Sequence, residues 1–501
     1  MARAVLLRIY LHRMATLRTV TKNTLLYSFS TVLQRSSSII FFPIFSYYLT
    51  KGDYGIQSVV SFVTQFITIF CGLELTRTAT RLIHEGDDFE ARAKEIYGSY
   101  LVTIFALHVA VSALLLVIGQ WVMRPFLNDI PFYPYMALTL CSLPFAAMYG
   151  LYKNYLQSTH QGARFVKMDF LYFLCNVGFN LFFVIVYRMG AAGIILSAVV
   201  SGFVFSVYAY FAFFRHTRLR FDPAVLREGL RFSLPLIPFI LIGVLMEWSD
   251  KIVLNAKSGK DAGGILYIAT MIAAFFTVLR ESCNQALMPW FYQQYGKLPK
   301  AYVHRVVYAA FAGLAIVAVC LSWFTYEILV TLSSNPDLVK AYQYAPIIVN
   351  TALVVFLSQI FYMVVMFFKT NTRYLFLTSV VGVAVNLGMS LILIDRFGIY
   401  GAAVSNFLAM FFMTITCGIL SHRSGFKMNY AYFLAIIAGS IGLSLLALLP
   451  LPFWTMLGMK TLIAGLMVLG FYLYLARHFP IQALLLERLK PLLALVQRAR
   501  G

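Results

Sequence analysis

Apolar stretches of about 20 residues recur along this sequence from one end to the other, with few charged residues inside them. A stretch of that length crosses the hydrocarbon core of a bilayer, about 30 Å thick, as an α-helix. Of the 501 residues, 61% are hydrophobic and 12% are charged, whereas a soluble domain carries about 25% charged residues. We therefore expect an all-α polytopic membrane protein.

The positions of the apolar stretches predict about fourteen transmembrane helices. They are expected at residues 23–49, 54–82, 97–120, 132–157, 168–188, 191–214, 231–256, 263–294, 303–325, 343–368, 374–395, 398–421, 430–449 and 454–476. Apolar residues at helical spacing predict cytoplasmic amphipathic segments at 1–22 and 477–501. Arginines interrupt the first of these too often for a cleavable signal peptide. A basic cytoplasmic linker is expected at 215–230.

The basic residues lie mostly in alternate loops. If the N-terminus is cytoplasmic, the inside segments hold roughly 29 Lys and Arg, and the outside loops hold roughly 9. This asymmetry predicts that both termini are cytoplasmic in a bacterial inner (plasma) membrane. It also explains the net charge of +21 without a nucleic-acid partner.

No catalytic or metal site is expected. The six cysteines fall inside apolar stretches and form no C-x-x-C pair, so they read as small buried hydrophobic residues. No pair of histidines has a spacing typical of metal ligands. No loop is long enough to fold as a soluble domain, which argues against a membrane enzyme.

Parts of the sequence recur at a shift of about 208 residues. An R-x-G-x-x-G pattern occurs at 188–193 and again at 396–401, and a D-x-G pattern at 53–55 matches one at 261–263. Either pattern alone is typical of a tight turn. Their common shift indicates a duplication.

The duplication predicts two six-helix bundles, at residues 23–214 and 231–421, followed by two further helices within 422–476. The bundles are expected to be related by a pseudo-two-fold axis along the membrane normal. Duplicated bundles are typical of secondary transporters, whose substrate path lies at the interface of the repeats.

Four short segments carry a family resemblance: Thr50–Gly55, Leu234–Pro238, Ser249–Leu254 and Gly264–Ala269. They resemble, in order, the turn after the first helix, the Pro-containing start of the seventh, an S-x-D-R-x-x-L segment and a G-x-Y-x-x-A start to the eighth. Lys251 stands where Arg is usual, and the last segment has one extra residue. With the expected helix order, the whole chain resembles the polysaccharide transporter branch of the multidrug/oligosaccharidyl-lipid/polysaccharide (MOP) exporter superfamily, which includes the O-antigen (Wzx-type) flippases.

The resemblance implies two six-helix lobes around a central cavity. It implies a flippase that moves an undecaprenyl-pyrophosphate-linked oligosaccharide repeat unit from the cytoplasmic to the outer leaflet by alternating access. Such a protein serves O-antigen (lipopolysaccharide), capsule or exopolysaccharide biosynthesis. We expect a monomer that contacts membrane lipid, the lipid-linked glycan, and the polymerase and export machinery. No cofactor is expected apart from H⁺ or Na⁺ as a coupling ion.

Charged residues inside the expected helices are candidates for the substrate site, because an ionised side chain at bilayer depth costs about 2.5–3.5 kcal/mol or more and needs a partner or a wet cavity. Arg35 and Arg280 each lie in a polar run. A planar guanidinium gives phosphate bidentate contacts and stays charged, so we interpret both as diphosphate ligands. The run that begins at Arg280 adds three candidates: Glu281, Asn284 and Gln285. The alternative for each arginine is a structural ion pair, although adjacent residues on a helix point about 100° apart, so Arg280 need not pair with Glu281.

Two further sets of charges stand near helix ends. Glu74 and Arg77 lie three apart toward the cytoplasmic end of the second expected helix and can pair on one face. Arg77 lies near the inner mouth, where a pyrophosphate would enter. Glu74, Glu247 and Asp250 are candidates for ion coupling, with solvation at the outer interface as the alternative for Asp250.

Three other functions compete with this interpretation. A lipid II flippase is a close relative. A MATE-type exporter would exchange Na⁺ or H⁺ for cationic drugs, but the deep arginines and the two added helices favour an anionic, lipid-linked substrate. A membrane glycosyl-polymerase is least favoured, because the loops are short and the sequence is duplicated.

The charge asymmetry makes a direct prediction. A reporter that is active only in the periplasm should be inactive when fused at Gly501, and a cytoplasmic reporter should be active there. Periplasmic activity of the Gly501 fusion would contradict the predicted orientation.

Overall fold

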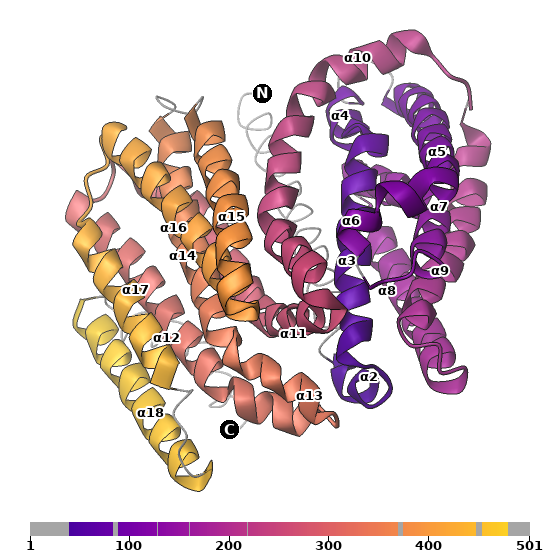
Figure 1. Cartoon of the computed structure of the whole chain (residues 1–501). Helices are drawn as coiled ribbons and strands as arrows, with labels where there is room; N and C mark the ends of the chain where they lie inside the picture. Colours follow the sequence, from indigo (N-terminus) through magenta and orange to yellow (C-terminus); the bar gives the residue numbers. More distant parts are fainter. Residues whose placement is uncertain are drawn as a thin grey trace, which may run out of the picture. The chain divides into compact units, whose positions relative to one another are not determined.

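The computed structural model describes residues 40–83, 89–127, 129–159, 161–217, 219–368, 374–446 and 453–478. Within those ranges the regular elements are all helices (Figure 1). This confirms the all-α fold class expected from the apolar stretches.

The helices follow the expected order. The first are α2 (Phe42–Tyr48), α3 (Lys51–Gly72), α4 (Leu75–Leu82), α5 (Phe89–Val122), α6 (Arg124–Leu127), α7 (Tyr135–Ser158), α8 (Gly162–Leu181), η1 (Phe182–Val186), α9 (Ala191–Ala212) and η2 (Phe214–His216). Next come α10 (Pro223–Ser233), η3 (Leu234–Leu236), α11 (Ile237–Gln294), α12 (Lys300–Leu332), α13 (Pro336–Val339) and η4 (Lys340–Gln343). The last are α14 (Ala345–Phe368), α15 (Leu375–Phe397), α16 (Ile399–Arg423), α17 (Tyr430–Leu445) and α18 (Phe453–His478).

Within the described residues, 11 helices are long and apolar enough to cross a membrane. One of them, Pro223–Gln294, includes the 58-residue helix α11, which as a straight helix would extend about 87 Å. Gly259 interrupts α11 with φ 80° and ψ 171°, between the expected spans 231–256 and 263–294. The protein is therefore a multi-pass membrane protein. The expected count of fourteen is not confirmed. The span predicted at 23–49 lies mostly outside the described residues, Pro223–Gln294 holds two expected spans, and Tyr430–Leu445 has only 16 residues.

The helix expected at 54–82 is broken near its end. Leu73 and Glu74 both take left-handed backbone conformations, with φ 47° and 53°, and separate α3 from α4. Each such residue costs roughly 1–2 kcal/mol. The hydropathy of the sequence does not reveal this break in the helix. Leu73 closes α3 by donating its N–H to Ile69 O at 3.1 Å.

The chain forms two compact units. The first unit comprises Met1–Phe275, Ile328–Tyr344 and Phe376–Phe412, and the second comprises Phe276–Glu327, Ala345–Leu375 and Met413–Gly501. These units divide the chain by contacts, whereas the predicted bundles at 23–214 and 231–421 divide it by sequence repeat. The duplication stays a prediction.

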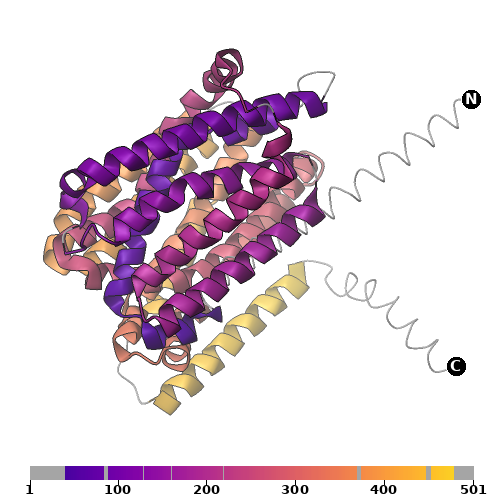
Figure 2. The same cartoon turned by 90° about the vertical axis from the view of Figure 1, so that its right-hand side faces the viewer.

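Long helices pack side by side within the first unit. Figure 2 shows this packing, in which α7 contacts α5, α8 and α9. Aromatic residues fill the space between these helices, and Tyr97, Tyr152 and Phe214 are fully buried. The Tyr97 hydroxyl donates to Asn154 Oδ1 at 2.7 Å, so this buried hydroxyl has a polar partner on α7.

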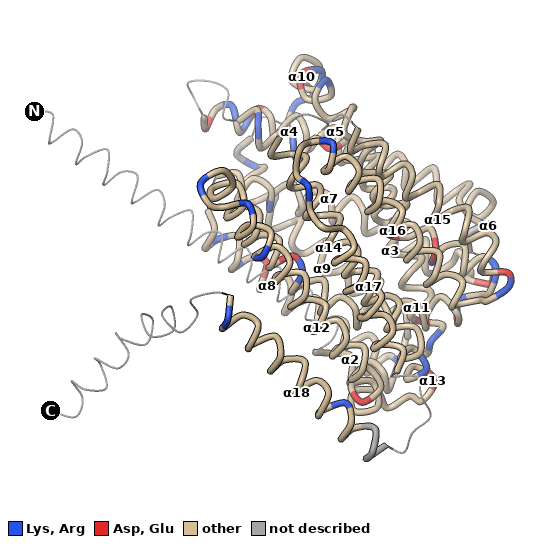
Figure 3. Tube along the Cα trace, turned by 90° about the vertical axis from the view of Figure 1, so that its left-hand side faces the viewer, with Lys and Arg blue, Asp and Glu red and all other residues tan. Residues whose placement is uncertain are grey.

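Charged residues gather mainly toward the ends of the helices (Figure 3). At one end of the first unit, α4 and α10 pack against each other and against α5 (Figure 1). There the Arg81 guanidinium lies 3.7 Å from the centre of the Phe232 ring, and Arg92 pairs with Glu228 at 2.8 Å. The loops at this end are those predicted to be cytoplasmic.

The break in α11 predicts a specific requirement for glycine. With φ 80° and ψ 171°, Gly259 occupies a region that is essentially closed to other residues and costs about 1–3 kcal/mol when forced. Gly259→Ala should therefore lower the thermal unfolding midpoint of the detergent-solubilised protein. Gly243→Ala is the matched control, because it lies in the same helix and a Cβ there meets nothing within 4 Å. Equal midpoints for the two variants would contradict the assignment.

Candidate functional site

A cluster of polar side chains lies between α11 and α14 in the second unit. Arg280 Nη2 pairs with Glu281 Oε1 at 2.6 Å, and Gln359 Nε2 donates to the same oxygen at 3.0 Å. The side chains of Arg280 and Glu281 are 11% and 31% exposed. Although adjacent on the helix, the two residues do pair, because both side chains are long enough to bend toward each other. In this conformation Arg280 therefore forms a structural ion pair, which was the alternative to its role as a diphosphate ligand.

The cluster keeps unused hydrogen-bonding capacity. Arg280 Nε and Gln359 Oε1 are both buried and have no hydrogen-bond partner among the described residues. A buried polar atom without a partner costs about 1–3 kcal/mol. Hydrogen bonding of both atoms to a polar ligand would remove that cost. A guanidinium edge matches phosphate oxygens, and the amide oxygen accepts from a hydroxyl group.

The other two candidates of this run lie one turn further along α11. Asn284 follows Arg280 by four residues and is half-buried, and Gln285 follows Glu281 by four residues and is exposed. Helical spacing therefore extends the polar face beyond the ion pair. Their role as cavity residues stays a prediction.

Gln359 was not predicted from the sequence. It is the one amide in the apolar run 351–368, and a buried amide in an otherwise apolar transmembrane helix usually has a partner on a neighbouring helix. That signal was present, but the sequence could not identify Glu281 as the partner.

A second buried charge lies in α11 within the first unit. Asp250 and Lys251 are 3% and 7% exposed, and Lys251 Nζ lies 3.6 Å from Asp250 Oδ1. Lys251 also donates to the backbone oxygen of Glu247 at 2.6 Å and lies 5.4 Å from the centre of the Trp248 ring. The carboxylate therefore already has a cation beside it. A coupling H⁺ or Na⁺ at Asp250 would have to share the carboxylate with Lys251.

Three helices meet one turn before Asp250. The backbone oxygen of Met246 accepts from Asn386 Nδ2 of α15 at 3.2 Å and from Asn406 Nδ2 of α16 at 3.4 Å. Glu247, the next residue, is exposed. Asp250 is thus the buried candidate for ion coupling, and Glu247 is the accessible one.

Glu74 and Arg77 form the pair that their spacing predicted. Arg77 Nε lies 2.9 Å from Glu74 Oε2, with the glutamate largely buried and the arginine exposed. Glu74 lies beyond the end of α3, where burial raises the pKa of its carboxyl and the Arg77 charge opposes that rise. Arg35 lies outside the described residues, so its place in a cavity stays a prediction.

The fold is shared with solved membrane transporters. The lipid II flippase MurJ in an inward closed conformation superposes with a TM-score of 0.63 at 14% identity, covering 89% of this chain and 99% of that chain. An inward-facing multidrug resistance MATE family transporter of the MOP superfamily gives 0.62 at 13% identity, with coverage of 78% and 94%. A variant of the Vibrio cholerae MATE transporter VcmN gives 0.56 at 14% identity, with coverage of 83% and 98%. The chain therefore has a MOP-type transporter fold.

The sequence also matches a defined family. The family described as polysaccharide biosynthesis protein matches residues 20–294, which is more than half of the chain. None of the curated proteins matches this sequence. The protein belongs to the polysaccharide biosynthesis protein family, as the resemblance predicted.

The Arg280 cluster makes a testable statement about stability. Glu281→Gln removes the charge partner of Arg280 and should lower the unfolding midpoint. In the double variant Arg280→Gln, Glu281→Gln, part of that loss should be recovered, with a coupling free energy of about 1–2 kcal/mol. The measurement is a double-mutant cycle on the detergent-solubilised protein. Arg305→Gln is the control, because Arg305 is exposed near the start of α12. Additive effects of the two substitutions would show that the ion pair does not form.

Proposed function

We propose that this protein is a flippase that moves an undecaprenyl-pyrophosphate-linked oligosaccharide repeat unit from the cytoplasmic to the outer leaflet by alternating access. The product would serve O-antigen, capsule or exopolysaccharide biosynthesis. Family membership supports polysaccharide biosynthesis as the process, and the MOP-type fold supports transport rather than enzymatic chemistry as the activity.

The observation that carries the proposal is the buried guanidinium of Arg280. Its Nε has no hydrogen-bond partner among the described residues, and neither has the nearby amide oxygen of Gln359. A site for cationic drugs would offer an unpaired carboxylate, whereas here the Glu281 carboxylate is paired with Arg280 and the donor left without a partner is a guanidinium N–H, which suits an anion. A diphosphate needs such a donor, and arginine meets it with two parallel N–H groups.

The same cluster gives a chemical reason for ion coupling. Glu281 neutralises Arg280 in this conformation, so an incoming diphosphate would replace Glu281 as the partner of the guanidinium. The released carboxylate would then need another cation, which a proton or Na⁺ can supply. Differential contacts of this kind are what allow a ligand to shift a two-state equilibrium.

Lipid II transport is the second candidate, because the lipid II flippase MurJ shares the fold over 89% of this chain. Its substrate is also lipid-linked, so a guanidinium site would serve both. The family description favours the polysaccharide substrate. Complementation of strains that lack one flippase or the other separates the two.

Placement in the cell follows from the same proposal. The protein would lie in the bacterial inner membrane with both termini in the cytoplasm, and would hand its product to the polymerase and export machinery outside. The basic end formed by α4 and α10 would then face anionic inner-leaflet lipid and incoming diphosphate. Arg77, exposed at that end, is suited to a first contact.

The proposal predicts the effect of Arg280 variants on export. Arg280→Gln should reduce polysaccharide export about 10- to 100-fold, the effect of losing hydrogen bonds from a charged group. Arg280→Lys should restore it only in part, because an ammonium lacks the planar fork. The measurement is complementation of a flippase-null strain at matched protein levels, with Arg305→Gln as the control. Full export by an Arg35→Gln, Arg280→Gln double variant would remove both arginines as substrate ligands.

A further inference from the structure

Two helices cross at one end of the first unit with their backbones in contact. A Cβ built on Gly55 of α3 would overlap the carbonyl oxygen of Lys260, and one built on Gly264 of α11 would overlap the carbonyl oxygen of Lys51. Real side chains do not tolerate such overlap, so only glycine at both positions allows this approach. The crossing lies where the chain enters α3 and where it resumes helical conformation after Gly259.

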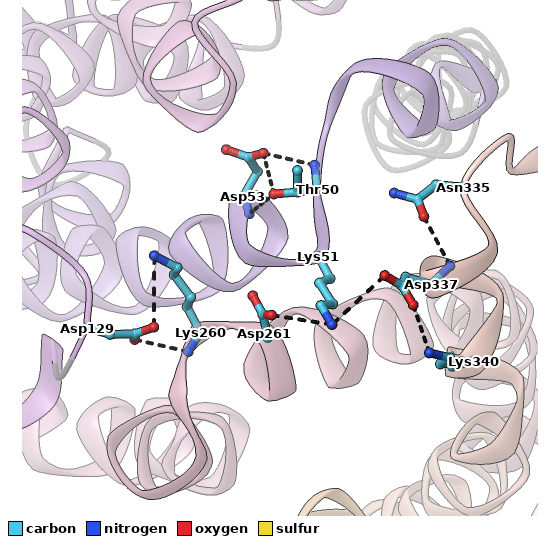
Figure 4. A network of polar contacts seen from close by, with 9 residues as sticks. All are labelled: Thr50, Lys51, Asp53, Asp129, Lys260, Asp261, Asn335, Asp337 and Lys340. Atoms are coloured by element: carbon cyan, nitrogen blue, oxygen red, sulfur yellow. Dashed lines mark hydrogen bonds and ion pairs between the residues drawn. The ribbon is translucent and has the colours of Figure 1, made fainter.

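Ion pairs flank the crossing on both sides (Figure 4). Lys51 Nζ lies 3.3 Å from Asp261 Oδ2 and 3.9 Å from Asp337 Oδ2. Lys260 Nζ lies 3.8 Å from Asp129 Oδ2, and its backbone N–H donates to Asp129 Oδ1 at 3.1 Å. We call these five residues, Lys51, Asp129, Lys260, Asp261 and Asp337, the outer latch.

Neighbouring residues fix the position and the charge of the Asp337 carboxylate that faces Lys51. Asn335 Oδ1 accepts from the Asp337 N–H at 3.0 Å, and Lys340 Nζ lies 2.7 Å from Asp337 Oδ1. The hydrogen bond from Lys340 and its charge, followed by the charge of Lys51, hold the pKa of the Asp337 carboxyl below its usual range. These contacts favour the ionised carboxylate, the form that pairs with Lys51.

The latch joins the two predicted repeats in a crossed pattern. Asp129 and Asp337 stand 208 residues apart, and Lys51 and Lys260 stand 209 apart; both separations are close to the shift of about 208 residues between the predicted repeats. Lys51 of the first repeat reaches Asp337 of the second, and Lys260 of the second reaches Asp129 of the first. Each repeat therefore supplies one lysine and one aspartate to equivalent contacts across the crossing.

We propose that the Gly55–Gly264 crossing and the outer latch form the gate that closes the outer mouth of the transporter and must part when substrate leaves. The proposal rests on the proposed function and orientation, since alternating access requires a reversible closure between the repeats on the outer side. The crossing closes the path sterically, because backbone contact leaves no room for a side chain or water. The ion pairs of the outer latch hold the two helices together and can break and re-form.

The strength of the pairs suits a gate that opens in every cycle. The latch side chains are partly exposed, and exposed pairs are individually weak and screened by salt. A few such pairs bias the closed state without locking it. The pair of Lys257 with Asp395, at 2.7 Å, is shorter but joins two segments of the second repeat only, so it should not respond to gate opening.

Asp129→Asn and Asp337→Asn test the latch. Both changes keep the shape of the side chain and remove its charge, so the fold should persist. The probe is a cysteine at Ser58, which is buried and lies two turns before Gln65, whose Oε1 accepts from Trp248 of α11. Ser58 therefore lies on the face of α3 that packs against α11. Labelling by a membrane-impermeant maleimide from the outside reports how often the gate opens, with the native cysteines measured as background in the parent without Ser58→Cys.

Each single substitution should raise the labelling rate of Ser58→Cys about two- to fivefold, the population change expected from one exposed ion pair. The double variant should show roughly the product of the two effects. Asp395→Asn is the matched control and should leave the rate unchanged. Equal rates in the parent, in the Asp395→Asn control and in the double variant would overturn the proposal. An equal rise in Asp129→Asn, Asp337→Asn and Asp395→Asn would also overturn it.

Gly264→Ala is an independent arm that leaves every charge in place. It should also raise labelling, because the added methyl group pushes the crossing apart; an unchanged rate would overturn the role of the crossing. Labelling needs no substrate, so it separates this inference from the proposed function. Increased labelling in a protein that fails to complement any flippase-null strain would retain the gate and reject the substrate. Full complementation with unchanged labelling would retain the proposed substrate and reject the gate.

Discussion

Hydrocarbon offers no hydrogen bonds and little screening, and this constraint underlies the structure. It forces the backbone into helices that satisfy their own N–H and C=O groups. It also requires that each charge at bilayer depth have a partner. Arg280 has Glu281, Asp250 has Lys251, and Lys460 of α18 pairs with Glu327 of α12 at 2.7 Å. The cost of exposing a charge to lipid is several times the worth of a surface pair, so these partners are obligatory.

Two kinds of electrostatic contact follow, and they suit different tasks. Arg280, with a side chain that is 11% exposed, is less accessible to water than the lysines at the rim, so a ligand can replace Glu281 as its partner only by supplying an equivalent charge. This makes the pair selective. Pairs at the rim, such as Lys260 with Asp129, are exposed and weak, so they can form and break in every cycle. A transporter needs both: selective contacts to hold a charged substrate and reversible contacts to close behind it.

Two of the irregular backbone positions lie next to charged contacts. The left-handed pair Leu73–Glu74 sets the buried carboxylate against Arg77, and Gly259 turns α11 so that Lys260 and Asp261 reach the N-terminal end of α3. Such conformations are unfavourable alone and persist because the surrounding contacts require them. They divide long apolar runs into segments whose ends carry the charges.

The sequence by itself determined that the chain spans a membrane, that its fold is all-α, and the order of its helices. The length of an apolar run and the spacing of charges along it are local properties, and they alone decide whether a segment is stable in lipid. It also predicted that Glu74 and Arg77 can pair, and they do, although Glu74 lies just outside the helix that the prediction assumed. It did not reveal the break at Leu73–Glu74, the role of Gln359, or the pairing of Asp129 with Lys260. Those depend on which helices become neighbours. Residues 131 positions apart in the chain meet only when packing brings their loops together, so the partners of the charges were decided by the tertiary structure.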